Sequence, residues 1–220
     1  MNTIDQTLQS VTPTLMVPKF EEPVPLEKNG HRFWVASSGL WMEAVNDWSH
    51  VVLPVVYQDS VSMPYGDLSP RIDFTVDKLP LGLIEEFIDY ARKQPTIEVA
   101  GWIIWNRKER STRLQILESL EASEAHVQYV CPELNEDESL LIDIHSHGAF
   151  PAFFSGKDNN DDKGGFKVAV VVGNLDKPAV SICARLCVYG LYSPLPPPFM
   201  TLVDSEVEVD DGTHRQISAS

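Results

Sequence analysis

Apolar positions recur with helical spacing in one stretch of the chain. Across residues 80–94 they return every three or four positions, from Leu83 to Ala91. Pro80 suits the first turn of a helix, and Pro95 cannot continue one. The spacing therefore predicts an amphipathic helix over 80–94.

Short apolar runs bounded by polar residues, glycine or proline predict strands on both sides of this helix. These runs are residues 32–36, 51–56, 97–105, 140–147, 166–173 and 180–189. We expect residues 113–130 to form two strands joined by a turn, although 118–125 also has helical propensity. Residues 150–165 are predicted to form a polar loop. Together these elements predict a mixed α/β (α+β) fold.

The composition changes along the chain and predicts four parts. Prolines are frequent in residues 1–28, which we expect to form an irregular arm. A β-rich subdomain is predicted over 29–76, a mixed α/β domain over 77–195, and an acidic tail over 196–220. The β-rich part also holds three of the five tryptophans, which we interpret as core residues: Trp34, Trp41 and Trp48.

Charge and cysteine content narrow the class of protein. The 220 residues include 17 basic and 32 acidic ones, a formal net charge of −15. Such a surface repels phosphate groups, so we expect neither a nucleic-acid partner nor an anionic membrane. The apolar runs are far shorter than the roughly 20 residues that span a bilayer. With no secretory signal and three sparse cysteines, the sequence predicts a cytoplasmic protein with reduced thiols.

A candidate metal site follows the predicted strand 140–147. His145 and His147 are two positions apart, so both side chains lie on one face of a strand. Ser155 and Asp158 come shortly afterwards and form a helix-capping pattern, with Asp158 in the first turn. Two imidazoles and one carboxylate form an open zinc site with a fourth position for water. The alternative is a pair of ordinary histidines beside a helix cap.

One carboxylate stands inside the apolar run 97–105. Glu98 is its only ionisable residue. A buried position there is costly unless the side chain has a function, and burial would raise the pKa of Glu98 and favour proton transfer near neutral pH. The alternative is a glutamate at the strand edge that points to solvent.

These residues together resemble the motif of the JAMM/MPN metalloprotease family. That motif is an upstream glutamate (Glu98), His-x-His (His145 to His147) and, after seven further residues, Ser-x-x-Asp (Ser155 to Asp158). The resemblance covers about residues 78–192. Many members have proline after the second histidine, where this chain has Gly148.

The resemblance implies zinc bound by His145, His147 and Asp158, with Glu98 as the general base and Ser155 as donor to the oxyanion. It also implies an isopeptidase or peptidase that acts at the C-terminus of a ubiquitin-like protein. Two alternatives stay open: a non-catalytic scaffold of the same fold, and a zinc amidohydrolase acting on a small molecule or a sulfur-carrier adduct. The filled motif positions favour an enzyme.

Overall fold

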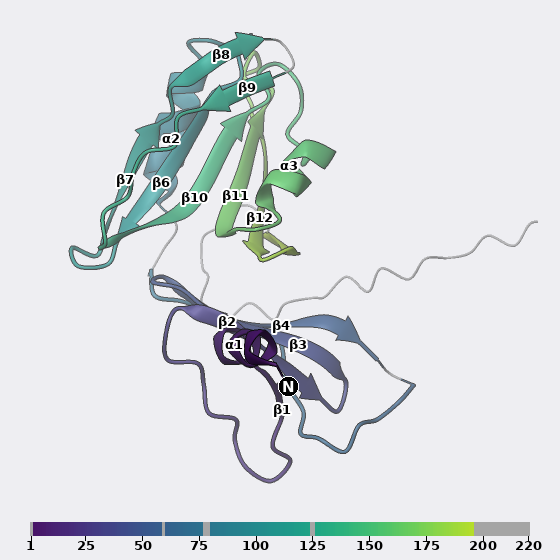
Figure 1. Cartoon of the computed structure of the whole chain (residues 1–220). Helices are drawn as coiled ribbons and strands as arrows, with labels where there is room; N and C mark the ends of the chain where they lie inside the picture. The colour runs from purple at the N-terminus through teal and green to yellow at the C-terminus, as the bar shows by residue number, and fades with distance from the viewer. Residues whose placement is uncertain (1, 59, 77–79, 124–125, 196–220) are drawn as a thin grey trace, which may run out of the picture.

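Two β-sheets of mixed strand direction form the body of the protein (Figure 1). The computed structural model describes residues 2–58, 60–76, 80–123 and 126–195. The helices in these ranges are α1 (Thr3–Val11), α2 (Leu81–Ala91) and α3 (Gly156–Asp162). The predicted mixed α/β fold is therefore confirmed.

The N-terminal sheet, called sheet A, has the strand order β1-β2-β3-β4-β5. Its strands are β1 (Thr14–Met16), β2 (Gly30–Ala36), β3 (Gly39–Val45), β4 (Ser49–Tyr57) and β5 (Arg71–Phe74). β1 runs parallel to β2, and the other pairs are antiparallel. Trp34, Trp41 and Trp48 are all buried, which confirms their interpretation as core residues.

The prediction of an irregular arm over 1–28 was wrong for its first part. Asn2 caps α1 by accepting a hydrogen bond from the Asp5 backbone N–H, and the prolines of this region begin only at Pro13, after the helix has ended. Beyond Pro13 the chain adds β1 to the edge of sheet A. The prolines therefore exclude a helix beyond α1 without excluding α1 itself.

The C-terminal sheet, called sheet B, has the strand order β13-β12-β11-β10-β6-β7. Its strands are β6 (Ala100–Asn106), β7 (Ser111–Ile116), β10 (Glu138–Ser146), β11 (Phe166–Gly173), β12 (Ser181–Val188) and β13 (Leu191–Leu195). β10 and β11 are parallel, and the remaining neighbours are antiparallel. A separate pair, β8 (Ser119–Ser123) and β9 (His126–Tyr129), follows β7.

The two faces of sheet B are covered by different elements. Side chains alternate across a strand, so Ile142 and Ile144 of β10 face the core, whereas Asp143 and His145 face the opposite side. α2 covers the core face, where its Phe87 ring lies 3.1 Å from the position of a Cβ at Gly101. The opposite face carries α3 and the β8–β9 pair in Figure 1, and the candidate site lies between them.

Sheet A packs against the end of sheet B at which β10 and β11 begin. The Trp48 ring lies 5.3 Å from the Phe166 ring, measured between centroids. Residues of both sheets belong to one apolar core, among them Met42 and Leu53 from sheet A and Leu186 from sheet B. The His-bearing end of β10 therefore points away from sheet A (Figure 1).

Most of the predicted elements are present, with differences at their edges. The helix and the runs 32–36, 51–56 and 166–173 are confirmed, whereas residues 113–130 hold parts of three strands, β7, β8 and β9, where two were predicted. The strands β1, β3, β5 and β13 were not predicted, and β6 begins at Ala100 rather than at residue 97. Residues 196–220, predicted as an acidic tail, lie outside the described residues. The four domain boundaries stay predictions.

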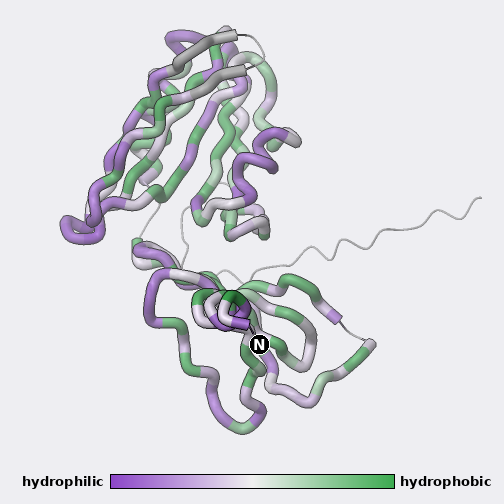
Figure 2. The backbone as a smooth tube through the Cα atoms, viewed as in Figure 1, coloured by the Kyte–Doolittle hydropathy of each residue, from purple (hydrophilic) through white to green (hydrophobic). Residues whose placement is uncertain are grey.

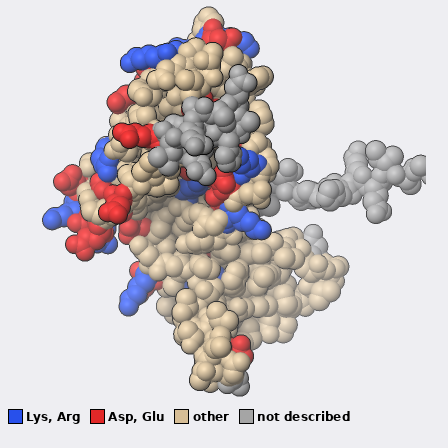
Figure 3. Space-filling model, turned by 45° about the horizontal axis from the view of Figure 1, so that its top comes forward, with Lys and Arg blue, Asp and Glu red and all other residues tan. Residues whose placement is uncertain are grey.

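Hydropathy and charge follow this architecture. The strands of sheet B are largely apolar, whereas α3 is hydrophilic along its length (Figure 2). Acidic and basic side chains are interspersed over the upper part of the molecule in Figure 3, while the lower part shows few charges on this face. Among the described residues, no helix combines the length and apolar character needed to cross a bilayer.

Candidate metal centre

Two histidines meet at the end of β10. His145 and His147 leave the same face of the chain, and their Nε2 atoms lie 3.2 Å apart. The backbone N–H of His147 donates to the Val172 carbonyl oxygen at 2.7 Å, which extends the pairing of β10 with β11 by one residue beyond β10 itself. The Phe153 ring packs edge-on against His147, with ring centroids 4.6 Å apart. The His147 imidazole is thus held in place by its neighbours.

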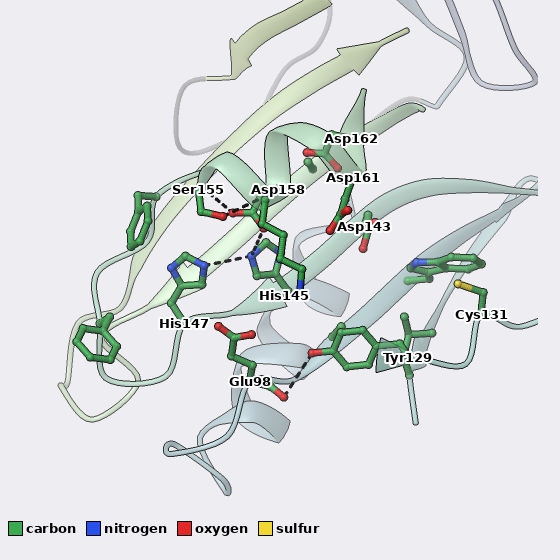
Figure 4. A pocket seen from close by; sticks show the side chains of 17 residues that line it. Glu98, Tyr129, Cys131, Asp143, His145, His147, Ser155, Asp158, Asp161 and Asp162 are labelled. Atoms are coloured by element: carbon green, nitrogen blue, oxygen red, sulfur yellow. Dashed lines mark hydrogen bonds and ion pairs between the residues drawn. The ribbon is translucent and has the colours of Figure 1, made fainter. Parts of the chain in front are cut away.

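The carboxylate comes from α3. Ser155 is the N-cap of this helix: its Oγ accepts from the Asp158 backbone N–H, and its own N–H donates to Asp158 Oδ2 at 2.6 Å. This capping box confirms the helix-capping interpretation of Ser-x-x-Asp. It leaves Asp158 Oδ1 directed at His145 Nε2, 3.4 Å away (Figure 4). The polar loop predicted over 150–165 therefore contains a short helix.

The donor set fits a zinc ion. One ligating atom from each of His145, His147 and Asp158 lies within 4.8 Å of the others. For bond lengths of about 2.0–2.1 Å, a tetrahedral zinc site separates its ligand atoms by about 3.3 Å. The observed Nε2–Nε2 and Nε2–Oδ1 distances are 3.2 and 3.4 Å. Three protein donors also leave one tetrahedral position free.

The protonation states of these groups suit metal binding. Burial lowers the pKa of His145, His147 lowers it further, and Asp158 only partly opposes the shift. His145 is therefore neutral at pH 7, with a lone pair on its ring. Burial would raise the pKa of Asp158, but the hydrogen bonds from Ser155 and the nearby histidines outweigh it and lower this pKa overall. Asp158 is accordingly a carboxylate.

Glu98 lies beside this group, but the expectation that it is buried was wrong. The chain leaves α2 through a turn and enters sheet B only at Ala100, so Glu98 precedes β6 and is exposed. Its carboxylate is on the side of the pocket that faces the two histidines (Figure 4). Tyr129 approaches it from β9, where its hydroxyl donates to the Glu98 carbonyl oxygen at 3.5 Å.

Ser146, between the two histidines, has a structural role that was not predicted from the sequence. It is fully buried, and its Oγ accepts from the Val99 backbone N–H at 3.0 Å. The backbone N–H of Ser146 donates to the Val99 carbonyl oxygen at 2.8 Å. These two bonds set the spacing between Glu98 and the histidines. The signal in the sequence is a small polar residue that continues the core-facing alternation of Ile142 and Ile144.

Gly148 stands where many JAMM/MPN proteins have proline, and its geometry explains why this chain needs glycine. Its φ angle is +57°, and a Cβ there would lie 2.5 Å from the Pro95 carbonyl oxygen. The loop that follows is anchored to the β11–β12 turn, since the Leu175 N–H donates to the Gly148 carbonyl oxygen at 2.9 Å. Glycine in place of proline thus allows the tight turn of the chain at position 148.

The group opens into a pocket of about 620 Å³. Ala100, Trp102 and Ala169 of sheet B contribute to its lining, together with Tyr129 of β9 and the exposed ring of Phe150. Burial raises the pKa of Tyr129, and Glu98 and Asp143 raise it further, so the phenol keeps its proton. With a volume of about 620 Å³, the pocket is large enough for a peptide segment or a small molecule.

The cysteines do not form a second metal site among the described residues. Burial raises the pKa of Cys187 to about 12, and burial also raises that of Cys183. Both are thiols at neutral pH; Cys187 is buried and Cys183 is half-buried. Within this part of the chain, the group of His145, His147 and Asp158 is the candidate metal site.

Two family models match parts of the chain. Residues 80–186 match the family model described as prokaryotic homologs of the JAB domain, and residues 2–75 match a domain of unknown function, DUF2016. The solution structure of protein DSY2949 from Desulfitobacterium hafniense is similar at 20% identity over 51% of this chain and 85% of that chain, with a TM-score of 0.38. No curated protein matches the chain. Residues 2–75 are therefore similar to the DUF2016 family, and residues 80–186 are similar to the prokaryotic JAB family.

Proposed function

We propose that the protein is a zinc-dependent hydrolase of amide bonds, an isopeptidase or peptidase. The observation that carries this proposal is the convergence of His145, His147 and Asp158 within 4.8 Å, with Glu98 and Ser155 in the same pocket. The match of residues 80–186 to the prokaryotic JAB family supports it.

The role that we propose for each residue follows from its position in the site. His145, His147 and Asp158 would hold the zinc ion, which when bound acts as a Lewis acid and lowers the pKa of water. Glu98, exposed at the rim and facing the histidines, would accept the proton of the attacking water and deliver it to the leaving amine. Ser155 Oγ accepts from the Asp158 N–H, so its own hydrogen stays free to donate to the substrate oxygen.

We propose the C-terminus of a ubiquitin-like protein, or a related peptide, as the substrate. The family resemblance supports this assignment. The exposed rings of Phe150 and Phe153 beside the site offer apolar contact to a protein partner. A zinc amidohydrolase that acts on a small molecule or a sulfur-carrier adduct is the second candidate, and the pocket of about 620 Å³ has room for such a substrate. A non-catalytic scaffold is disfavoured because all five motif positions are filled.

The proposed setting is the cytoplasm, in line with three sparse thiols. The acidic, two-part chain is similar to protein A of a bacterial plasmid cassette with ParB-related and ThiF-related products, and we propose that assignment on this similarity alone. The proposed domain boundaries are those predicted above, with the catalytic domain over 77–195.

Zinc content and the Glu98→Gln variant test the proposal. Elemental analysis should find about one zinc per chain in the wild type and none when His145 and His147 are both replaced by alanine. Glu98→Gln should keep the zinc but lower turnover of ubiquitin-like fusions ending in Gly-Gly by roughly 10²–10⁴-fold. Glu85→Gln, an exposed glutamate on α2, is the matched control and should keep full activity.

Two results would contradict the proposal. Equal zinc in the wild type and in the double histidine variant would refute the metal site. A zinc-loaded wild type that cleaves none of a broad panel of fusions and small amides would instead support the scaffold alternative.

A further inference from the structure

α3 is a helix without an apolar side chain to hold it on the sheet. Its sequence, Gly-Lys-Asp-Asn-Asn-Asp-Asp, is hydrophilic throughout (Figure 2), and only its last residue, Asp162, is buried. Glycine, asparagine and aspartate are poor helix formers, and a helix of seven residues does not persist alone in water. Polar contacts with sheet B must therefore hold α3 on the sheet, as apolar packing does for other helices.

Arg185 of β12 provides the central contact. Its Nη1 donates to Asn159 Oδ1 at 2.6 Å, and its Nη2 donates to Asp162 Oδ2 at 2.7 Å. Asn159 and Asp162 are three positions apart, so they lie on one face of α3. Arg185 is 7% exposed, and its guanidinium carbon lies over the rings of Phe154 and Tyr192, 3.8 and 4.1 Å from their centroids. A planar, forked cation is suited to bind two acceptors while stacked between two rings.

Neighbouring groups complete the attachment of α3. Lys167 Nζ lies 2.9 Å from Asp162 Oδ1 and 2.5 Å from Asp143 Oδ2, so it joins the helix to β10. The Tyr192 hydroxyl donates to the Asn159 carbonyl oxygen at 2.6 Å. The two cations thereby balance the two carboxylates Asp143 and Asp162 inside the pocket wall.

This attachment bears on the metal centre because Asp158 is part of the same helix. The histidines belong to sheet B, whereas Asp158 precedes Asn159 on α3. We propose that Arg185 is the positioning residue of the metal centre: by holding Asn159 and Asp162 it fixes α3 on the sheet and Asp158 at His145. The inference rests on the metal site of the proposed function.

Zinc affinity, measured by competition with a chelator, tests the role of Arg185. Arg185→Met keeps the length of the side chain and removes the two donors. It should weaken zinc binding about 10–100-fold, the range seen when groups that orient metal ligands are removed. Arg113→Met is the matched control, because Arg113 pairs with Glu138 on the β7 side of sheet B, away from α3. It should bind zinc as the wild type does. Arg185→Lys keeps the charge without the fork and should be intermediate.

Asn159→Ala provides a variant with little risk to folding. Asn159 is exposed, and alanine is the better helix former, so intrinsic helix propensity rises while one Arg185 contact is lost. We expect weaker zinc binding and an altered absorption spectrum of the Co²⁺-substituted protein. Hydrogen exchange of the metal-free chain should also be faster at the α3 amides and unchanged in β10 and β11.

The outcomes separate this inference from the proposed function. Equal zinc affinity and equal α3 exchange in the wild type, Asn159→Ala and a folded Arg185→Met would overturn the positioning role and leave the metal site intact. A wild type that binds no zinc would overturn the metal site, and the positioning role with it.

Discussion

The indole N–H of Trp48, in the turn before β4, donates a hydrogen bond to the carbonyl oxygen of Leu140 in β10 at 3.0 Å. Trp48 is fully buried and belongs to the core shared by the two sheets. Since β10 ends at the candidate metal centre, the N-terminal domain supports the strand that carries the histidines.

Replacing Trp48 with phenylalanine should destabilise the protein through this bond. The substitution leaves the oxygen of the half-buried Leu140 without its indole donor, and loss of such a hydrogen bond costs about 0.5–1.5 kcal/mol. Trp105→Phe is the matched control, because the Trp105 Nε1 is buried without a hydrogen-bond partner among the described residues. Urea denaturation should show the larger loss of unfolding free energy for Trp48→Phe. Equal losses would show that the bond contributes nothing.

Glu43 should give the protein an acid-sensitive component of stability. This buried side chain accepts hydrogen bonds from Arg32 Nε at 2.7 Å, from Trp34 Nε1 at 2.8 Å and from the Leu26 N–H at 2.8 Å, and it contacts His50. Burial would raise the pKa of Glu43, but the bonds from His50 and its other partners lower it from 4.5 to about 2.

Because the folded-state pKa is the lower one, the stabilisation is present above pH 4.5 and is lost as the pH falls towards 2. Its full size is about 3 kcal/mol. The difference in unfolding free energy between the wild type and Glu43→Gln should therefore be largest above pH 5 and shrink towards pH 2. A difference that stays constant over this range would contradict the assignment.

Gly148→Ala should disturb the loop between the second histidine and α3. The substitution places a Cβ 2.5 Å from the Pro95 carbonyl oxygen at a φ angle of +57°. We expect a loss of about 1–3 kcal/mol in stability, together with weaker zinc binding. Gly156→Ala is the control, since a Cβ at this helical position meets nothing within 4 Å. It should stabilise the chain by up to about 1 kcal/mol. Thermal unfolding of both variants distinguishes the two outcomes.

Ser146→Ala should disturb the position of Glu98 while leaving metal binding intact. It leaves the buried Val99 N–H without its side-chain acceptor, at a cost of about 1–3 kcal/mol. Zinc content should be retained because both histidines remain, while turnover should fall. Ser139→Ala in the same strand is the control, since the Ser139 Oγ is buried without a partner within the described ranges. Unchanged turnover in Ser146→Ala would show that the Val99 bond does not position Glu98.

The sequence predicted the elements whose signal is local. The helix over 80–94 and the runs that became β10 and β11 can be recognised within a few residues, and the capping pattern of Ser155 and Asp158 marks the start of α3 inside the segment predicted as a polar loop. The spacing of the two histidines predicted that their side chains would meet.

The features that the sequence did not predict depend on contacts between distant segments. The exposure of Glu98 follows from where β6 joins its neighbours, which no local pattern fixes. Arg185 is separated from Asp162 by 23 positions, so its contact with α3 has no sequence signature. β13 was missed because Pro194 argues against a strand, yet β13 is the edge of the sheet, where proline is tolerated.

The Val99–Ser146 pairing has a consequence for how the site would respond to loss of its metal. Glu98 and both histidines are joined through hydrogen bonds of one sheet, so they form one rigid half of the candidate metal site. Ser155 and Asp158 form a second half of the site on α3, which the side chains of Arg185, Lys167 and Tyr192 attach to the sheet. Removal of the ion would leave the first half unchanged and free the second to shift. The metal-free protein should therefore differ from the loaded one in one short helix, and not in the pocket floor.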